Sequence, residues 1–159
     1  MKNNGFTLIE ALFAILLVGL AIASLMGANT SFTRSNGAGA ELSTAEFLLE
    51  QVKELTATLP VSDPGTTTWT MFGPEEASLA AYDDLDDFDG ASFSPPISAG
   101  RASLADFAAF TQQVAVQNVS ASNFGIVVAD RGSAFVRVTV RVLHNSAEIS
   151  SASWIRARY

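Results

Sequence analysis

Acidic residues stand at two places in this chain where a carboxylate could do chemistry. Glu10 lies alone inside an apolar run, "GFTLIEALFAILLVGL" at residues 5–20. Moving an ionised carboxylate into the centre of a bilayer costs roughly 2.5–3.5 kcal/mol on insertion scales, so this acid needs a partner or a place at the interface. The second place is "YDDLDDFDG" at residues 82–90, where crowded carboxylates are typical of a site for a hard cation such as Ca²⁺.

The aspartate run predicts a Ca²⁺ site, although its spacing matches no standard loop. The candidate ligands are its five aspartates: Asp83, Asp84, Asp86, Asp87 and Asp89. An EF-hand loop anchored on Gly90 would place Leu85 at the first ligand position and Pro96 where a glutamate belongs, so that pattern fails. Two alternatives stay open. The run is a solvated loop with Leu85 and Phe88 on the core, or it is an acidic patch that docks on a basic neighbour.

The sequence offers no catalytic constellation, and we predict that the protein is not an enzyme. His144 is the only histidine, it falls in a predicted turn, and there are no cysteines. A triad or a metal centre cannot be built from one loop histidine, and neither a P-loop nor a dinucleotide fingerprint is present. The formal net charge of −7 argues against nucleic acid as a partner.

The element that must position Glu10 is an apolar helix at residues 6–28. Its length of roughly 34 Å exceeds the bilayer core of about 30 Å. Lys2 precedes it and the next basic residue is Arg34, so we expect a single-pass inner-membrane protein with a cytoplasmic N-terminus. Taken alone, the run is a cleaved secretory signal, for which an internal glutamate is unusual, or an uncleaved signal anchor with Glu10 near the headgroups.

A third interpretation accounts for both Gly5 and Glu10. The segment "GFTLIEALFAILLVG" resembles the N-terminal signature of type IV pilins and of the pseudopilins of type II secretion. The resemblance covers about 20 to 25 of the 159 residues. It implies that residues 1–5 are a leader peptide, which the membrane-bound prepilin peptidase removes by cutting between Gly5 and Phe6. The same enzyme then methylates the new amine of Phe6, and Glu10 becomes the fifth mature residue.

The resemblance also gives Glu10 a role in assembly. When subunits stack, its carboxylate can meet the new amine of Phe6 on a neighbouring subunit. A pair shielded from water is worth more than an exposed ion pair, and a buried charge costs much less when it is paired. Glu10 would therefore set the register between pilin subunits as they leave the inner membrane for a periplasmic or extracellular filament.

Beyond the apolar run, the sequence predicts a helix that continues over residues 29–59. Apolar residues recur at three and four positions, as in an amphipathic helix: Leu42, Ala45, Leu49, Val52 and Leu55. Gly37 and Gly39 weaken this stretch as a hinge, a melted turn or a short break, and Pro60 ends it. We expect one long helix from about residue 6 to about residue 58.

The remaining chain divides into an acidic irregular connection at residues 60–103 and an antiparallel sheet region at residues 104–159. "FVRVTVRVL" at residues 135–143 alternates valines with polar residues and predicts a half-buried strand. Further strands are expected at 112–119, 124–129 and 147–156, whereas 104–110 fits a short helix or a strand. The predicted class is α+β: three or four strands in a meander against the second half of the helix, which resembles the pilin fold.

These features favour a structural subunit, a minor pilin or pseudopilin of a type IV pilus or of a type II secretion pseudopilus. The absence of cysteines departs from many major pilins, which close a C-terminal loop with a disulfide. The alternative is a signal-anchored inner-membrane protein whose exported domain binds a ligand or an ion without forming filaments. An exported enzyme with a disposable signal is a third possibility, and no catalytic residues support it.

Overall fold

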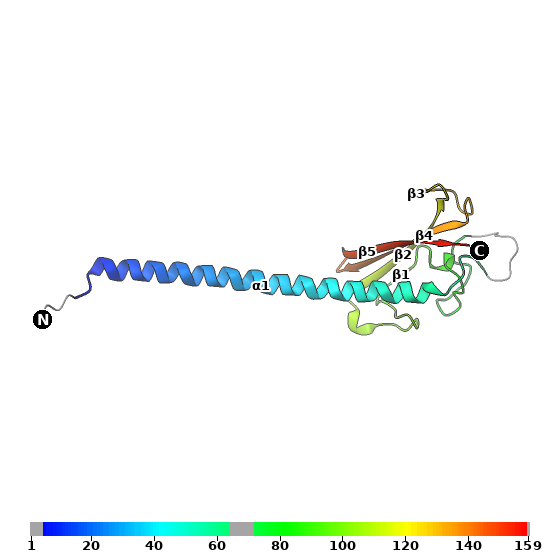
Figure 1. The fold of residues 1–159 in the computed structure, drawn as a ribbon. Helices are drawn as coiled ribbons and strands as arrows, with labels where there is room; N and C mark the ends of the chain where they lie inside the picture. Colours follow the sequence, from blue (N-terminus) through cyan, green and yellow to red (C-terminus); the bar gives the residue numbers. More distant parts are fainter. Residues whose placement is uncertain (1–4, 64–71, 159) are drawn as a thin grey trace. The chain divides into compact units, whose positions relative to one another are not determined.

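The computed structural model describes residues 5–63 and 72–158 (Figure 1). The chain divides into two compact units, residues 1–40 and residues 41–159. Helix α1, Leu8–Ala57, contributes to both units and is continuous through Gly37 and Gly39. The predicted long helix is therefore confirmed, and the two glycines take helical geometry rather than a break.

In the first unit, α1 is apolar on all sides over its first part, residues 8–28. Large hydrophobic side chains are exposed along this part; Phe13, Leu16 and Leu25 are 59–66% exposed. By length and composition α1 can cross a membrane. A helix that is hydrophobic all round belongs in an apolar environment, either lipid or neighbouring helices.

In the second unit, α1 buries one face. The buried residues follow helical spacing: Ala45, Leu48, Leu49, Val52, Leu55 and Thr56. The expectation that Leu42 belongs to this face is wrong, because its side chain is 43% exposed. Leu42 lies about one helical turn before Ala45, which is the first residue of α1 in the core cluster. Leu48, which is fully buried, takes its place because it neighbours both Ala45 and Val52 on the helix surface.

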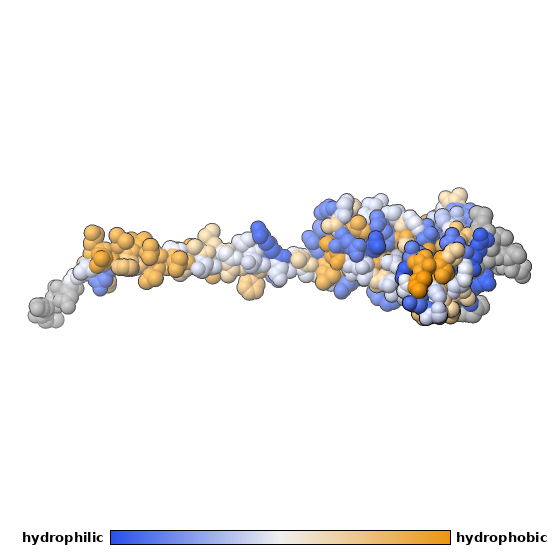
Figure 2. Space-filling model, turned by 90° about the horizontal axis from the view of Figure 1, so that it is seen from above, coloured by the Kyte–Doolittle hydropathy of each residue, from blue (hydrophilic) through white to orange (hydrophobic). Residues whose placement is uncertain are grey.

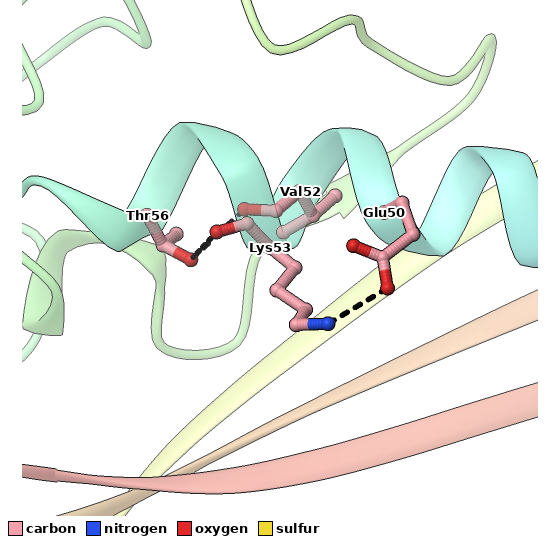
Figure 3. Close-up of polar contacts among 4 residues, drawn as sticks. All are labelled: Glu50, Val52, Lys53 and Thr56. Carbon is pink, nitrogen blue, oxygen red and sulfur yellow. Dashed lines mark hydrogen bonds and ion pairs between the residues drawn. The ribbon is translucent and has the colours of Figure 1, made fainter.

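Polar groups on this part of α1 are satisfied locally or from the sheet (Figure 3). The Thr56 hydroxyl donates to the Val52 carbonyl at 2.9 Å, and Lys53 Nζ lies 2.7 Å from Glu50 Oε1. The final carbonyls of a helix lack partners within it. Arg156 provides donors for these carbonyls. Its guanidinium donates to the carbonyls of Thr56 and Ala57 at the end of α1, and to that of Leu59 just beyond it, at 2.9–3.0 Å.

The sheet has five antiparallel strands, one more than the upper expectation (Figure 1). They are β1 (Ser92–Phe93), β2 (Phe110–Ser120), β3 (Asn123–Val127), β4 (Phe135–His144) and β5 (Ala147–Ala157). The strand order is β1-β2-β4-β5, and β3 pairs with β2 off this path. The expected meander is therefore wrong at one point: β2 pairs directly with β4, from Phe110↔His144 to Val119↔Phe135.

The short strand β3 explains this difference. All its residues are exposed, and its pairing with β2 is irregular, with a register shift between the pairs Val119↔Val127 and Ser120↔Asn123. It contributes no side chain to the core cluster, so burial does not place it between β2 and β4. The segment at 104–110, left open by the sequence, forms the 3-10 helix η2 (Ala105–Phe107) and then begins β2.

The core lies between α1 and the valine face of the sheet. The four alternating valines of β4 are fully buried, as predicted: Val136, Val138, Val140 and Val142. Val114 and Val116 of β2 join them, together with Leu85 and Phe88 of the acidic connection. The acidic connection is therefore fixed to the core of the second unit by these two apolar side chains.

One buried polar residue joins three parts of this unit. Gln112 of β2 is fully buried, and its Oε1 accepts from the Ile97 amide at 2.7 Å. Its Nε2 donates to the Leu48 carbonyl of α1 at 2.8 Å and to the Ile97 carbonyl at 3.1 Å. Gln112 thus links the helix, the connection and the sheet, with its polar atoms satisfied as burial requires.

Candidate functional site

The first candidate site is the beginning of α1, where Thr7 and Glu10 bond to each other. Glu10 Oε2 accepts from the Thr7 amide and from the Thr7 hydroxyl, both at 3.1 Å. In return, Thr7 Oγ1 accepts from the Glu10 amide at 3.3 Å. This is a capping box, in which the N-cap threonine and the glutamate three residues later satisfy each other's free amides.

The capping box lowers the cost of placing the Glu10 carboxylate in an apolar helix. Within one chain, its carboxylate already has two donors, so it is not a bare acid in an apolar helix. Its charge also lies at the positive end of the helix dipole, which favours an anion. The spacing Thr-x-x-Glu at residues 7–10 is itself the sequence signature of this cap.

Gly5 and Phe6 immediately precede this cap and are accessible. Phe6 is 88% exposed, and a Cβ added to Gly5 would meet no described atom within 4 Å. The fold therefore gives no packing reason for a glycine at this position. Figure 2 shows apolar residues gathered along the N-terminal part of α1 that follows. The predicted cleavage and methylation at Gly5 and Phe6 remain predictions.

The second candidate site is the aspartate run, which is far less solvated than its composition suggests. Asp83 is exposed, but Asp84, Asp86 and Asp87 are each only 1% exposed. Leu85 and Phe88 between them are fully buried, as the solvated-loop alternative expected for these two anchors. The short 3-10 helix η1 (Asp86–Phe88) holds the run in place.

Most of these carboxylates bond to backbone amides. Asp84 Oδ1 accepts from the amides of Asp86 and Asp87 at 3.0 and 3.2 Å, and Asp87 Oδ2 accepts from those of Asp83 and Asp84 at 2.8 and 3.2 Å. Asp89 Oδ1 accepts from the Val116 amide of β2 at 2.7 Å. The aspartates thus shape the connection, because short acidic side chains satisfy backbone donors in turns.

Arg101 stabilises the backbone next to the aspartate run. Its guanidinium donates to the carbonyls of Leu79 and Ala80 at 3.0 and 3.1 Å, and also to that of Tyr82. These carbonyls lie directly before the aspartate run. Through these three carbonyls, the guanidinium orders the backbone that leads into the run.

Three carboxylates meet beside η1. One oxygen from each of Glu75, Glu76 and Asp87 lies within 4.8 Å of the other two. Asp87 belongs to the predicted set, whereas Glu75 and Glu76 were missed, and Asp83, Asp84, Asp86 and Asp89 do not join this group. Proximity of the Asp87 carboxyl and then burial raise the pKa of Glu76 to about 7, and burial raises the pKa of Glu75.

Burial also raises the pKa of two neighbouring acids. The pKa of Asp84 rises to about 9, mainly by desolvation and then by the adjacent Asp86 carboxyl, and desolvation likewise raises the pKa of Asp86. Asp86 Oδ2 accepts from the Gly73 amide at 3.3 Å, while its Oδ1 is buried with no partner among the described residues. The whole cluster therefore favours neutralisation, since removing charge from water is costly.

His144 is not in the predicted turn. It is the last residue of β4, its ring stacks on Phe110 at 4.5 Å, and its Nδ1 lies 3.5 Å from Glu41 Oε1. These contacts join the end of the sheet to α1 within the second unit.

Comparison with known proteins gives a match at the N-terminus. Residues 1–26 match the family model described as the prokaryotic N-terminal methylation motif. No curated protein and no solved structure matches this chain. The matched stretch contains Gly5, Phe6, Thr7 and Glu10, and it ends within α1. The resemblance noted from the N-terminal residues is thereby confirmed.

Proposed function

We propose that this chain, a type IV pilin- or pseudopilin-like precursor by its N-terminal methylation motif, is a minor subunit of a type IV pilus or of a type II secretion pseudopilus. One observation carries the proposal. The motif at residues 1–26 opens a helix whose side chains are exposed and apolar, and the same helix ends in a separately folded α+β unit. Such a helix requires lipid before assembly and other helices after it.

The processing step follows from the order of residues. Prepilin peptidase in the inner membrane would cut between Gly5 and Phe6 and methylate the amine of Phe6. The cut removes the charged leader, including Lys2, and leaves the new amine one residue before the N-cap threonine. The amine would then lie only about one helical turn, or roughly 5 Å along the helix axis, before Glu10.

The capping box gives Glu10 two alternative sets of partners. In the free subunit, Thr7 of the same chain satisfies its carboxylate. In the filament, the Phe6 amine of a neighbouring subunit replaces or joins that contact with a charge-assisted bond, which is stronger than a neutral one. The contact with Thr7 lowers the cost of Glu10 in the membrane before assembly. The contact with the neighbouring Phe6 amine favours transfer of the subunit from the membrane into the filament.

A minor subunit fits better than a major one. The chain has no cysteines with which to close a C-terminal loop. Its connection between α1 and the sheet carries a buried acidic cluster, which is a specialised feature rather than a requirement of the fold. A non-filamentous, signal-anchored protein is the competing function, and the fate of the leader distinguishes the two.

Intact mass measurement tests the proposal. The chain is expressed in membranes with and without an active prepilin peptidase. With the peptidase, we expect loss of residues 1–5 and addition of one methyl group. Gly5→Val should stay uncut, because its branched side chain crowds the scissile bond. Gly37→Ala, at an exposed helical glycine, should be cut like the wild type. A wild-type chain that stays full length beside an active peptidase would overturn the proposal.

A further inference from the structure

We infer that Glu75, Glu76 and Asp87 form a binding site for a hard divalent cation, with Ca²⁺ as the ion that fits best. The inference is independent of the proposed assembly function. One carboxylate oxygen from each residue lies within 4.8 Å of the other two. Oxygens that share one Ca²⁺ ion lie 2.3–2.6 Å from it, and hence no more than about 5 Å from each other. The three oxygens therefore already have the spacing of a common ligand set.

A second observation points to a ligand at this place. Asp87 is 1% exposed, and its Oδ1 has no hydrogen-bond partner among the described residues. Glu76 Oε2 is likewise buried and without a partner in that part of the chain. An ionised carboxylate only accepts hydrogen bonds, so these atoms need a cation or a proton. Buried acceptors of this kind are rare when nothing neutralises them.

The fold fixes Asp87 for such a role. Its other oxygen, Oδ2, accepts from the amides of Asp83 and Asp84, which orients the carboxylate and leaves Oδ1 directed elsewhere. The neighbouring Phe88 is fully buried and packs edge-on to Tyr82 at 5.1 Å. A ligand held in this way needs little ordering when the ion arrives, which lowers the entropic cost of binding.

The ligand set differs from a simple run of aspartates. Asp84 and Asp89 direct oxygens to backbone amides, and Asp83 is exposed. The site instead joins Asp87 of η1 with two glutamates that come earlier in the connection. Three carboxylates offer enough negative charge for one divalent ion. Ca²⁺ suits them better than Mg²⁺, because it tolerates irregular oxygen geometry whereas Mg²⁺ demands a near-ideal octahedron.

Direct Ca²⁺ binding tests the inference. The full chain is purified in dodecyl maltoside, stripped with EDTA and dialysed at pH 7.5 against ⁴⁵Ca²⁺. We expect one bound ion per chain, with a dissociation constant of about 0.1–1 mM, as in exported Ca²⁺ modules. The melting temperature followed by circular dichroism should rise with Ca²⁺, since the ion binds the folded state. Mg²⁺ and NaCl at equal ionic strength should raise it less.

Paired variants identify the ligands. Glu76→Gln and Asp87→Asn should each weaken binding by at least about 10-fold, whereas Glu46→Gln and Asp83→Asn, at exposed acids, should bind within about twofold of the wild type. If Asp87→Asn loses its fold, Glu76→Gln decides. A folded wild type that binds no Ca²⁺ at 10 mM, or a Glu76→Gln variant that binds normally, would overturn the inference. The first result would leave a shared proton as the group that neutralises these oxygens.

Discussion

Replacing Gln112 with leucine should destabilise the second unit strongly, although the two side chains have similar volumes. Gln112 is fully buried and makes three hydrogen bonds, one from the Ile97 amide and two to the carbonyls of Ile97 and Leu48. Leucine would leave the buried Ile97 amide without this acceptor. An unsatisfied buried donor costs about 1–3 kcal/mol, and each lost hydrogen bond about 0.5–1.5 kcal/mol. We therefore expect a loss of about 2–4 kcal/mol.

Urea unfolding of the full chain in dodecyl maltoside, followed by tryptophan fluorescence, measures this loss. Trp154 lies in β5 and packs against the core cluster, so its signal reports on the second unit. Gln113→Leu is the matched control, since Gln113 is the next residue of the same strand and is exposed. Its effect should stay within about 0.5 kcal/mol. A Gln112→Leu midpoint equal to that of Gln113→Leu would refute the role assigned to Gln112.

Two further substitutions test the packing of α1. Arg156→Ala should lower the unfolding free energy by about 1–3 kcal/mol, because it leaves the carbonyls of Thr56, Ala57 and Leu59 without their donor; the exposed Arg141→Ala is the control in the same urea titration. An equal effect of the two would contradict the helix-end role of Arg156. Val140→Ala should cost about 2–3 kcal/mol by leaving a cavity in the core, and a loss below about 0.5 kcal/mol in calorimetry would show that this position is not packed.

Local patterns in the sequence predicted the helix and the β4 strand well. The 3.6-residue period and the alternation of Val136 to Val142 are properties of adjacent residues, so they can be read without a fold. The pairing of β2 with β4 could not be predicted, because register depends on contacts between distant segments. Burial of Gln112 was also hidden, since only the folded chain shows which polar side chain finds enough partners.

The N-terminal motif and the acidic cluster differ in how far apart their residues lie in the sequence. Gly5, Phe6 and Glu10 lie within six residues of one another, so the methylation motif that contains them can be read from local sequence without a fold. The acidic cluster joins Asp87 to Glu75 and Glu76, which come more than ten residues earlier in the chain, so local sequence could not group them. The Ca²⁺ ligands expected from the run of aspartates stay a prediction. The capping box of Thr7 and Glu10 was available from spacing alone.

Covalent capture of the bond between subunits tests the central claim most directly. Wild-type chain and a Thr7→Ser copy, which keeps the capping hydroxyl, are co-expressed with a prepilin peptidase and an assembly machinery. A zero-length carbodiimide then joins amines to carboxylates in contact, and the masses of the crosslinked peptides show whether a wild-type peptide is joined to a Thr7→Ser peptide. We predict Phe6–Glu10 links between the two copies, absent from Glu10→Gln. Phe6–Glu10 links found only within one chain, or no such links at all, would contradict assembly through this pair.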